Sequence, residues 1–491
     1  MGHRFLFYFL SACIVTGCSV SKYNADKKYS PQQLQDDYSL MRNILEKEHP
    51  SLYWYTPKDS MDYYFDAGYK KITDSMTELQ FGWSVLAPVI SKIHCGHTGF
   101  SMSKGWDRFI RNKRIPSFPL YIKLCRDTMT ITGNLNRKDS VLKRGTVITG
   151  INGIRSGPLI KKMFDYLSED GYADNVNYVR VSSNFPYFHR NIFGLYKNYS
   201  VGYLDSTGNE RKMIVPLFVP IVDTTKKVRP PVPANKPDRP TRKERLSFIR
   251  SMQVDTPSNT ALITLNSFSK GHLKNFYHTS FKTIRKQKVS NVIIDLRNNG
   301  GGEINNYTAL SKYIRTTKFK VCDTAVAVTK GFGPYTKYIH AGFWNNLGLF
   351  FLTKKHADNL YHFSYWENHT FRPRRKSHFN GKVFVITNGL TFSASSLFCN
   401  SVKGQPNVTL VGEETGGGWY GNSGIMIPDI TLPNTKLRVR LPVFKLVQYN
   451  HISTKGTGVL PDINVYPSVA DVKNNADRKM EVIKEMIRSG K

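Results

Sequence analysis

The stretch KVFVITNGLTFSASSLFCNSVK, residues 382–403, decides the fold of the C-terminal half of the chain. It starts with an apolar run, turns at an Asn-Gly pair and continues with residues that favour a helix beginning near Thr391. An apolar run that ends in a turn and leads into a helix is typical of a buried strand in an α/β unit. We therefore predict a strand over 382–388, followed by a helix that carries Ser393 in its first turn.

Ser393 is the candidate nucleophile of this segment. Backbone N–H groups in the first turn of a helix have no partner within the helix, and the positive end of the helix dipole lies there. A serine oxygen at that place can carry negative charge. Ser395 and Ser396 follow closely; serines at a helix start are often caps, and the sequence leaves open whether either of them takes the role instead.

A second motif is NVIIDLRNNGGGE, residues 291–303, in which an apolar strand runs into three glycines. Consecutive glycines let the backbone approach a substrate closely, and their N–H groups can bind an oxyanion. No GKS or GKT follows and no GxGxxG pattern is present, which argues against a nucleotide site. We expect Asp295 and Arg297 to brace this loop rather than to act chemically.

The third motif is KIHCGHTGF, residues 92–100. A neutral imidazole can take the proton of a serine hydroxyl, so His94 and His97 are the candidate bases. Apolar residues at helical spacing over Gln80–Cys95 predict a helix that stops at Gly96 and leaves His97 just beyond its end. The pair lacks the glutamate of HExxH and a third ligand cluster, so we expect neither a metal nor another cofactor.

The N-terminus has the layout of a signal peptide, with Arg4, an apolar stretch and small residues before Cys18. Residues 1–17 are therefore expected to be removed. The ending Val-Thr-Gly-Cys resembles a bacterial lipobox, which implies an exported chain anchored to a membrane through lipid on Cys18. A plain secretory signal is the alternative. Ser19 and the absence of an acidic patch favour the periplasmic side of the outer membrane, with residues 18–30 as a polar tether.

The rest of the chain is predicted to be a multidomain α/β protein. The segment LKRGTVITGINGIRSGPLIKKMFDYL, residues 142–167, resembles the strand, Asn-Gly turn and helix of a PDZ domain, which binds a peptide as an added strand. Five further segments are expected: a helical region over 31–114 that carries His97, a PDZ-like β-rich domain over 115–221, a proline-rich basic linker over 222–247, an α/β core over 248–470 and a C-terminal helix over 471–491.

Composition sets limits on function. The chain has 491 residues, of which 40% are hydrophobic, so it is long enough for two or three units. Its net charge of +34 is spread along the sequence without a nucleic-acid-binding module, so we expect no nucleic acid partner. Attraction to an anionic membrane surface or to acidic substrates explains the charge, with a merely solvated basic surface as the alternative.

Four cysteines remain after the signal peptide and Cys18 are set aside: Cys95, Cys125, Cys322 and Cys399. Their wide, irregular spacing predicts neither a disulfide framework nor a metal site. Buried free thiols are the favoured interpretation, and a bridge between Cys95 and Cys399 is the alternative, since both flank candidate catalytic segments.

Four motifs in order, DLRNNGGG, TNGLTFSASSLF, LVGEETGGG and GVLPDI, resemble the tail-specific, or C-terminal-processing, protease family. The resemblance extends over residues 31–470, with the PDZ-like segment and CGHT in their expected places. It implies a ClpP/crotonase-like α/β core and a serine endopeptidase that acts on protein or peptide substrates. Carried over by position, it makes Ser393 the nucleophile and the amides of Ala394 and Gly301 the oxyanion donors.

One branch of this family activates its serine with a lysine, and Gly418 occupies that place here. The resemblance therefore shifts to the branch typified by the tricorn core protease, which uses a histidine, here His97. The family's orienting glutamate would precede GVLPDI, where this sequence has His451, Ser453, Thr454 and Lys455. The third member of the triad is therefore unknown. The acids near these motifs in the sequence are Glu413, Glu414 and Asp462, each of which also has a purely structural interpretation.

The missing lysine and the unknown acid also motivate a different class of function. The chain could be an inactive lipoprotein that keeps the protease fold and binds peptides or glycans. Aromatic residues in the insertion at 331–380, such as Trp344, Tyr361 and Trp366, would suit a carbohydrate site, although core packing explains such residues more often. The oligomeric state and the physiological substrate are beyond what the sequence predicts.

Overall fold

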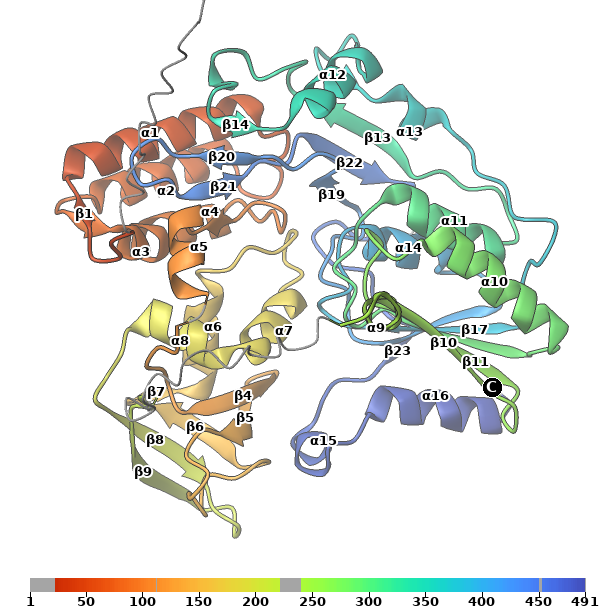
Figure 1. The fold of residues 1–491 in the computed structure, drawn as a ribbon, viewed down its shortest axis with the longest axis horizontal. Coiled ribbons are helices and arrows are strands. Elements are labelled where there is room, and N and C mark those ends of the chain that lie inside the picture. The colour runs from red at the N-terminus through yellow and green to blue at the C-terminus, as the bar shows by residue number, and fades with distance from the viewer. Residues whose placement is uncertain (1–22, 112, 221–239, 450–452, 491) are drawn as a thin grey trace, which may run out of the picture.

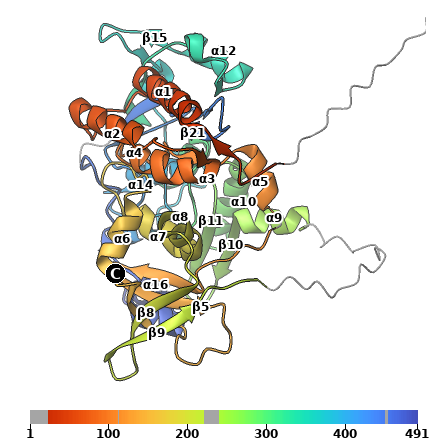
Figure 2. The ribbon, with the colours of Figure 1, turned by 90° about the vertical axis from the view of Figure 1, so that its left-hand side faces the viewer.

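The computed structural model describes residues 23–111, 113–220, 240–449 and 453–490. A helical N-terminal region lies above a β-rich domain on one side of the molecule, and the C-terminal α/β unit occupies the other side (Figure 1). Figure 2 shows the same stacking from the side. Cys18 and the predicted signal peptide lie outside the described residues. In the part of the chain that the structure describes, no helix combines the length and apolar character needed to cross a bilayer.

The C-terminal unit is built on a six-stranded sheet in the order β10-β11-β12-β17-β18-β23. Only β10 and β11 pair antiparallel; the other neighbours are parallel, as crossover connections require. This confirms the predicted α/β core. Its strands are β10 (Arg250–Asp255), β11 (Thr260–Leu265), β12 (Asn291–Asp295), β17 (Lys382–Thr387), β18 (Val408–Gly412) and β23 (Ile463–Asn464).

Helices cover both faces of this sheet, and alternate residues of its strands serve the two faces. Val292 and Ile294 belong to the main core, whereas Ile293 between them belongs to a smaller core on the opposite face. Three helices of the C-terminal unit cover the face that belongs to the main core, and the C-terminal helix α16 covers the opposite face (Figure 1). The helices are α10 (Leu273–Lys286), α11 (Ile304–Ile314), α14 (Ala394–Val402) and α16 (Arg478–Arg488).

The β-rich domain is an antiparallel sheet in the order β4-β5-β6-β8-β9 and has a hydrophobic core of its own. The predicted turn at Asn152 and Gly153 is present, with both φ angles positive at +49° and +82°, as a tight hairpin turn requires. Its resemblance to a PDZ domain stays a prediction. The elements are β4 (Leu120–Cys125), β5 (Thr128–Asn134), β6 (Val147–Ile151), β7 (Ile154–Arg155), β8 (Asn198–Leu204), β9 (Glu210–Pro216), α6 (Ser156–Phe164), α7 (Asn175–Ser183) and α8 (Phe185–Phe193).

The N-terminal region is mainly helical and shares the main core with the C-terminal unit. The predicted helix over Gln80–Cys95 has a π-helical middle and ends earlier, at Ser91. His94 adopts a φ of +53°, which a helix does not tolerate, so turns replace the last predicted residues. The elements are α1 (Pro31–Glu48), α2 (Lys58–Lys70), α3 (Glu78–Gln80), η1 (Phe81–Leu86), α4 (Ala87–Ser91), β3 (Phe100–Ser101) and α5 (Lys104–Ile110).

Strand β3 carries the histidine segment to the C-terminal unit, because it pairs with β21 (Arg438–Arg440) at the edge of the sheet β14-β20-β21-β3. A fifth sheet has the order β15-β16-β13-β22-β19. The remaining elements of this part are β13 (Cys322–Ala327), η2 (Gly333–Tyr335), β14 (Ile339–His340), α12 (Phe343–Leu352), β15 (Lys354–Lys355), β16 (Tyr361–His362), α13 (Ser364–Asn368), β19 (Gly421–Gly424), β20 (Asp429–Thr431) and β22 (Phe444–Gln448).

Three segments differ from the sequence-based expectation. Residues 23–30 are not a free tether: β1 (Lys28–Tyr29) pairs with β2 (Met76–Thr77), and the Tyr23 ring packs on aromatic neighbours. Helix α9 (Arg242–Ile249) begins inside the predicted linker, because a capping box at Thr241 starts it; residues 221–239 lie outside the description. The predicted C-terminal helix is two helices, α15 (Val469–Asn474) and α16, separated at left-handed Asn475.

Side chains that the sequence left ambiguous are placed as follows. The cysteines Cys95, Cys125, Cys322 and Cys399 are buried and unpaired, so the alternative bridge is absent from this structure. Trp366 of the aromatic insertion is buried, and Tyr361 packs against the main core. The side chain of Trp344 lies outside the described part of the chain.

Candidate active site

Ser393 lies at the cap position before helix α14, with backbone angles φ +53° and ψ −124°. Residues with a side chain rarely adopt this conformation, and it places the hydroxyl at a sharp turn between β17 and the helix. The two alternative serines are fully buried, and the Ser396 hydroxyl donates to the Thr391 carbonyl oxygen at 3.0 Å. Ser393 alone of the three is partly exposed. The geometry therefore favours Ser393 over Ser395 and Ser396 as the nucleophile.

The glycine loop packs directly on this turn. A methyl group on Gly301, whose φ is +98°, would lie 2.7 Å from Ser393 Cβ and 2.9 Å from the Ala394 nitrogen. The Gly301 N–H, expected to bind an oxyanion, instead donates to Asn299 Oδ1 at 3.0 Å. The buried Asn299 side chain thus forms a hydrogen bond within the glycine loop and occupies the N–H that was expected to bind the oxyanion. The N–H groups of Ala394 and Gly300 have no acceptor within the described residues.

A second glycine loop also packs on the turn at Ser393. A methyl group on Gly417 would lie 2.8 Å from the Ser393 nitrogen. At Gly418, the place of the lysine in the other branch of the family, a methyl group would lie 2.2 Å from the Gly421 carbonyl oxygen. Real side chains do not approach a backbone oxygen this closely. The structure therefore has no room for a lysine at this position.

His97 reaches the same place from the N-terminal region. Its buried imidazole packs against Phe392, the neighbour of Ser393, with ring centroids 4.7 Å apart and the ring planes tilted by 40°. The following residue is held by a hydrogen bond between Thr98 Oγ1 and His49 Nε2 at 2.8 Å. Neither ring nitrogen of His97 has a hydrogen-bond partner among the described residues. The structure thus brings His97 to the nucleophile turn without a hydrogen bond to Ser393.

Asp170 is the residue that the sequence did not single out. Its side chain is 3% exposed, and its carboxylate accepts from the Gly96 nitrogen at 2.7 Å and from the Gly418 nitrogen at 3.1 Å. One of its oxygens lies 3.8 Å from Nδ1 of His97. The neighbouring Glu169 pairs instead with His94, the other candidate base, at 2.9 Å. The loop after α6 therefore sets one carboxylate against each histidine.

Comparison with known proteins assigns the family. Residues 259–465, which include the strand, the glycine loops and Ser393, match the model of peptidase family S41. This region is an S41 peptidase. Members of this family are serine-type peptidases, so the chain is an enzyme that cleaves peptide bonds. No curated protein matches the sequence.

Solved structures are similar to this chain over more than the region that matches the family model. Mature CPAF is 13% identical with a TM-score of 0.61, and the alignment covers 94% of this chain and 98% of that one. CPAF complexed with lactacystin is 12% identical with a TM-score of 0.61, and the alignment covers 94% of this chain and 99% of that one. A putative peptidase from Parabacteroides merdae is 15% identical with a TM-score of 0.47, and the alignment covers 94% of this chain and 97% of that one. At these identities the CPAF structures show a shared fold, N-terminal region included.

The acids that lie near the motifs in the sequence, and were candidates for the third triad member, make other contacts in the structure. Asp462 pairs with Lys403 and accepts from the Leu410 nitrogen at 2.8 Å, and Glu414 accepts from the Gly458 nitrogen at 2.6 Å. His451 lies outside the described residues. Asp295 pairs with Arg297 at 2.7 Å, just before the glycine loop; that the pair braces this loop stays a prediction.

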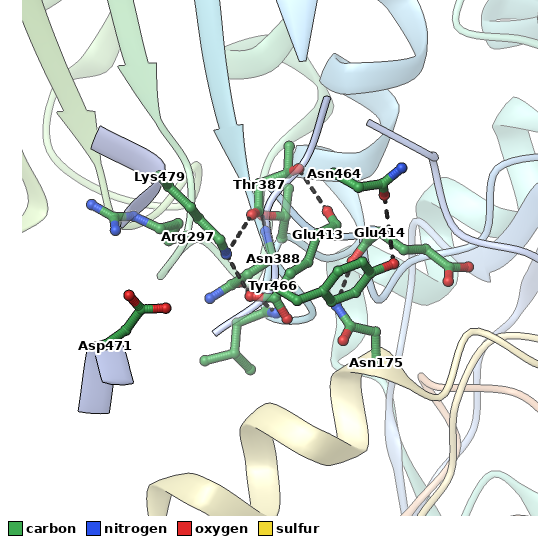
Figure 3. Close-up of polar contacts among 12 residues, drawn as sticks. Asn175, Arg297, Thr387, Asn388, Glu413, Glu414, Asn464, Tyr466, Asp471 and Lys479 are labelled. Carbon is green, nitrogen blue, oxygen red and sulfur yellow. Dashed lines mark hydrogen bonds and ion pairs between the residues drawn. The ribbon is translucent and has the colours of Figure 1, made fainter. Parts of the chain in front are cut away.

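Glu413 belongs to a buried ion pair behind the nucleophile strand (Figure 3). Lys479 of α16 contacts its carboxylate at 2.5 Å and donates to the Thr387 carbonyl oxygen at 3.0 Å. The Thr387 hydroxyl in turn donates to the Glu413 carbonyl oxygen at 2.7 Å. Burial lowers the pKa of Lys479 below its ordinary value, partly offset by Glu413. The pair fixes the end of β17 just before the turn to Ser393.

Proposed function

We propose that this S41 peptidase is an exported endopeptidase that hydrolyses extracytoplasmic proteins through an acyl-enzyme on Ser393, with His97 as the general base. One observation carries the proposal: Ser393 is partly exposed in a strained turn, and its neighbour Phe392 packs against the buried imidazole of His97, whose ring nitrogens have no hydrogen-bond partner in the described residues. Strained backbone and unpartnered buried polar groups both cost stability, and both are typical of catalytic positions.

The chemistry follows from these positions. Ser393 Oγ attacks the carbonyl carbon of the scissile peptide bond while His97 takes its proton. The oxyanion that forms accepts from the Ala394 N–H at the start of helix α14, where the helix dipole also stabilises negative charge. His97 then donates the proton to the leaving amine as the carbon–nitrogen bond breaks. Water, activated by His97, hydrolyses the acyl-enzyme and restores Ser393.

Asp170 is the positioning residue that this proposal adds for His97. Its oxygen is 3.8 Å from Nδ1 of the imidazole, and a movement of roughly 1 Å would bring the pair within hydrogen-bond range. Such contacts are often long in the absence of substrate and shorten when it binds. A buried carboxylate at that place stabilises the imidazolium and fixes its tautomer, which is the task of a third triad member.

A Ser393→Ala variant tests the proposed function. We expect it to lose cleavage of unfolded casein and labelling by a fluorophosphonate probe, while its circular dichroism stays that of the wild type. Ser395→Ala is the matched control and should retain labelling, because Ser395 is buried in the helix. A wild-type protein that the probe does not label would instead favour the inactive, peptide-binding alternative.

The proposal also includes a lipid anchor on Cys18 and a place at the outer membrane facing the periplasm. It is supported by the lipobox-like ending of the N-terminal apolar stretch. Metabolic labelling with a clickable fatty acid should mark the wild-type chain and not a Cys18→Ser variant. Equal labelling of the two chains would contradict the anchor while leaving the peptidase assignment intact.

A further inference from the structure

A cavity of about 810 Å³ lies between the N-terminal helices and the β-rich domain. It begins at the catalytic segment itself, because Gly96, Thr98 and Gly99, on either side of His97, form part of its wall. Arg440 of β21 lines the same end, and its backbone nitrogen donates to the Gly99 carbonyl oxygen at 2.9 Å. A substrate chain bound at Ser393 therefore has this cavity within reach of its side chains.

The charges on the cavity wall do not balance. Four arginines line it against one acid, Asp107. Asp107 is already paired with Arg438, at 2.7 Å, and Arg438 also lies 3.6 Å from Asp429. Arg440 is exposed and has no acid within ion-pair distance among the described residues. Two further arginines, Arg180 and Arg190, add positive charge and have no ion pair in the described part of the chain.

Arg180 connects the cavity to the catalytic groups. Its guanidinium carbon lies 5.9 Å from the ring centre of Phe392, against which His97 also packs. Burial lowers the pKa of Arg180, an effect opposed by Asp170 and Glu169 and increased by Arg440. Arg180 and Arg440 thus put two of the four positive charges of this wall near the catalytic segment, where a bound carboxylate would stabilise both arginines.

Uncharged polar groups of the cavity also lack partners. Trp83 is 6% exposed, and its indole N–H has no acceptor within the described residues. Both the nitrogen and the oxygen of the Asn191 side-chain amide also lack a partner there. Both residues line the cavity. Buried polar groups without hydrogen bonds are costly, so a ligand that offers both donors and acceptors would be favoured. A peptide backbone has this chemistry, and the aromatic walls suit apolar side chains beside it.

We propose that this cavity is a substrate subsite that selects an acidic side chain next to the cleaved bond, with Arg440 as its main contact. The inference rests on the proposed endopeptidase function and names its substrate class. A glutamate or aspartate carboxylate pairs with the guanidinium of Arg440, and the adjacent peptide groups bond to Asn191 and Trp83. The excess of positive charge over the whole chain, +34, draws the same substrates to the surface.

The test uses internally quenched peptides, taken from a casein cleavage site, that carry glutamate or glutamine at each position around the cleaved bond in turn. A charge-assisted hydrogen bond predicts about a tenfold higher kcat/KM for glutamate at one position. Arg440→Gln should reduce that ratio to about one, and Arg440→Lys should retain part of it. Arg285→Gln, an exposed arginine of α10 without an ion pair in the described residues, is the matched control and should keep the full ratio.

Binding gives a readout that does not depend on turnover. The Ser393→Ala protein is titrated with fluorescein-labelled Ala-Phe-Glu-Phe-Ala and with its glutamine counterpart, and Kd is measured by fluorescence anisotropy. We expect about tenfold tighter binding of the glutamate peptide, lost in the double variant with Arg440→Gln. Active protein with equal kcat/KM for both peptide sets, or equal Kd values, overturns the subsite. Failure of the wild type to cleave any peptide overturns the endopeptidase function, and the Kd values then still decide the subsite.

Discussion

Replacing Lys479 by methionine tests how the C-terminal helix supports the catalytic turn. The Lys479 and Glu413 side chains are 10% and 7% exposed, and the lysine makes two contacts, to the Glu413 carboxylate and to the Thr387 carbonyl oxygen (Figure 3). Methionine fills a similar volume but leaves the carboxylate buried without its cation. Breaking a buried pair in this way costs about 3–5 kcal/mol of unfolding free energy.

Urea unfolding followed by tryptophan fluorescence measures this loss, and a double variant identifies its cause. Adding Glu413→Gln to Lys479→Met removes the stranded charge, so the double variant should recover about 1–3 kcal/mol relative to Lys479→Met alone. Lys484→Met, an exposed lysine of the same helix, is the matched control and should change stability by less than about 0.5 kcal/mol.

Activity should follow the same order, because Thr387 ends the strand that leads to Ser393. We expect Lys479→Met to lower kcat for casein under conditions in which the protein remains folded, with kcat of the control unchanged. The reasoning would be refuted by a loss of less than about 1 kcal/mol in Lys479→Met, or by effects of the two substitutions that simply add.

Three further predictions concern the site and its loops. Asp170→Asn should lower kcat about a hundredfold and shift the pH-rate profile while Tm changes little; a large fall in Tm with an unshifted profile would indicate a structural role only. Gly301→Ala should lose activity on casein and about 1–3 kcal/mol of stability, measured by urea unfolding, because its φ of +98° and its contact with Ser393 leave no room for a methyl group. Burial raises the pKa of Glu414 from 4.5 to about 7. The folded protein therefore holds a proton there that the unfolded chain releases above about pH 4.5, and the unfolding free energy should fall by about 1–3 kcal/mol as pH rises from 4.5 to 7. Glu414→Gln should flatten this part of the stability profile, and an unchanged slope would contradict the assignment.

Much of the C-terminal unit was predictable because its signals are local. Three predicted segments each combine an apolar run with turn residues that require a specific backbone conformation: the strand of 382–388, the glycine loop of 291–303 and the Asn-Gly hairpin. The structure confirms all three. Other boundaries depended on tertiary contacts. The helix over Gln80–Cys95 ends at Ser91 because His94 takes a left-handed conformation that lets its ring meet Glu169.

Asp170 shows why part of the site was beyond local patterns. It lies in the β-rich domain, and the groups it joins, Gly96 and Gly418, come from the two other regions of the chain. Proximity to GVLPDI in the sequence made Asp462 and Glu414 candidates for the third triad member. In the structure each carboxylate instead accepts a hydrogen bond from a backbone amide. The absence of a side chain at Gly418 was visible in the sequence as a missing lysine. In the structure its buried backbone amide is instead what the Asp170 carboxylate binds, so the position that has no room for a lysine helps to hold the acid of the proposed histidine mechanism.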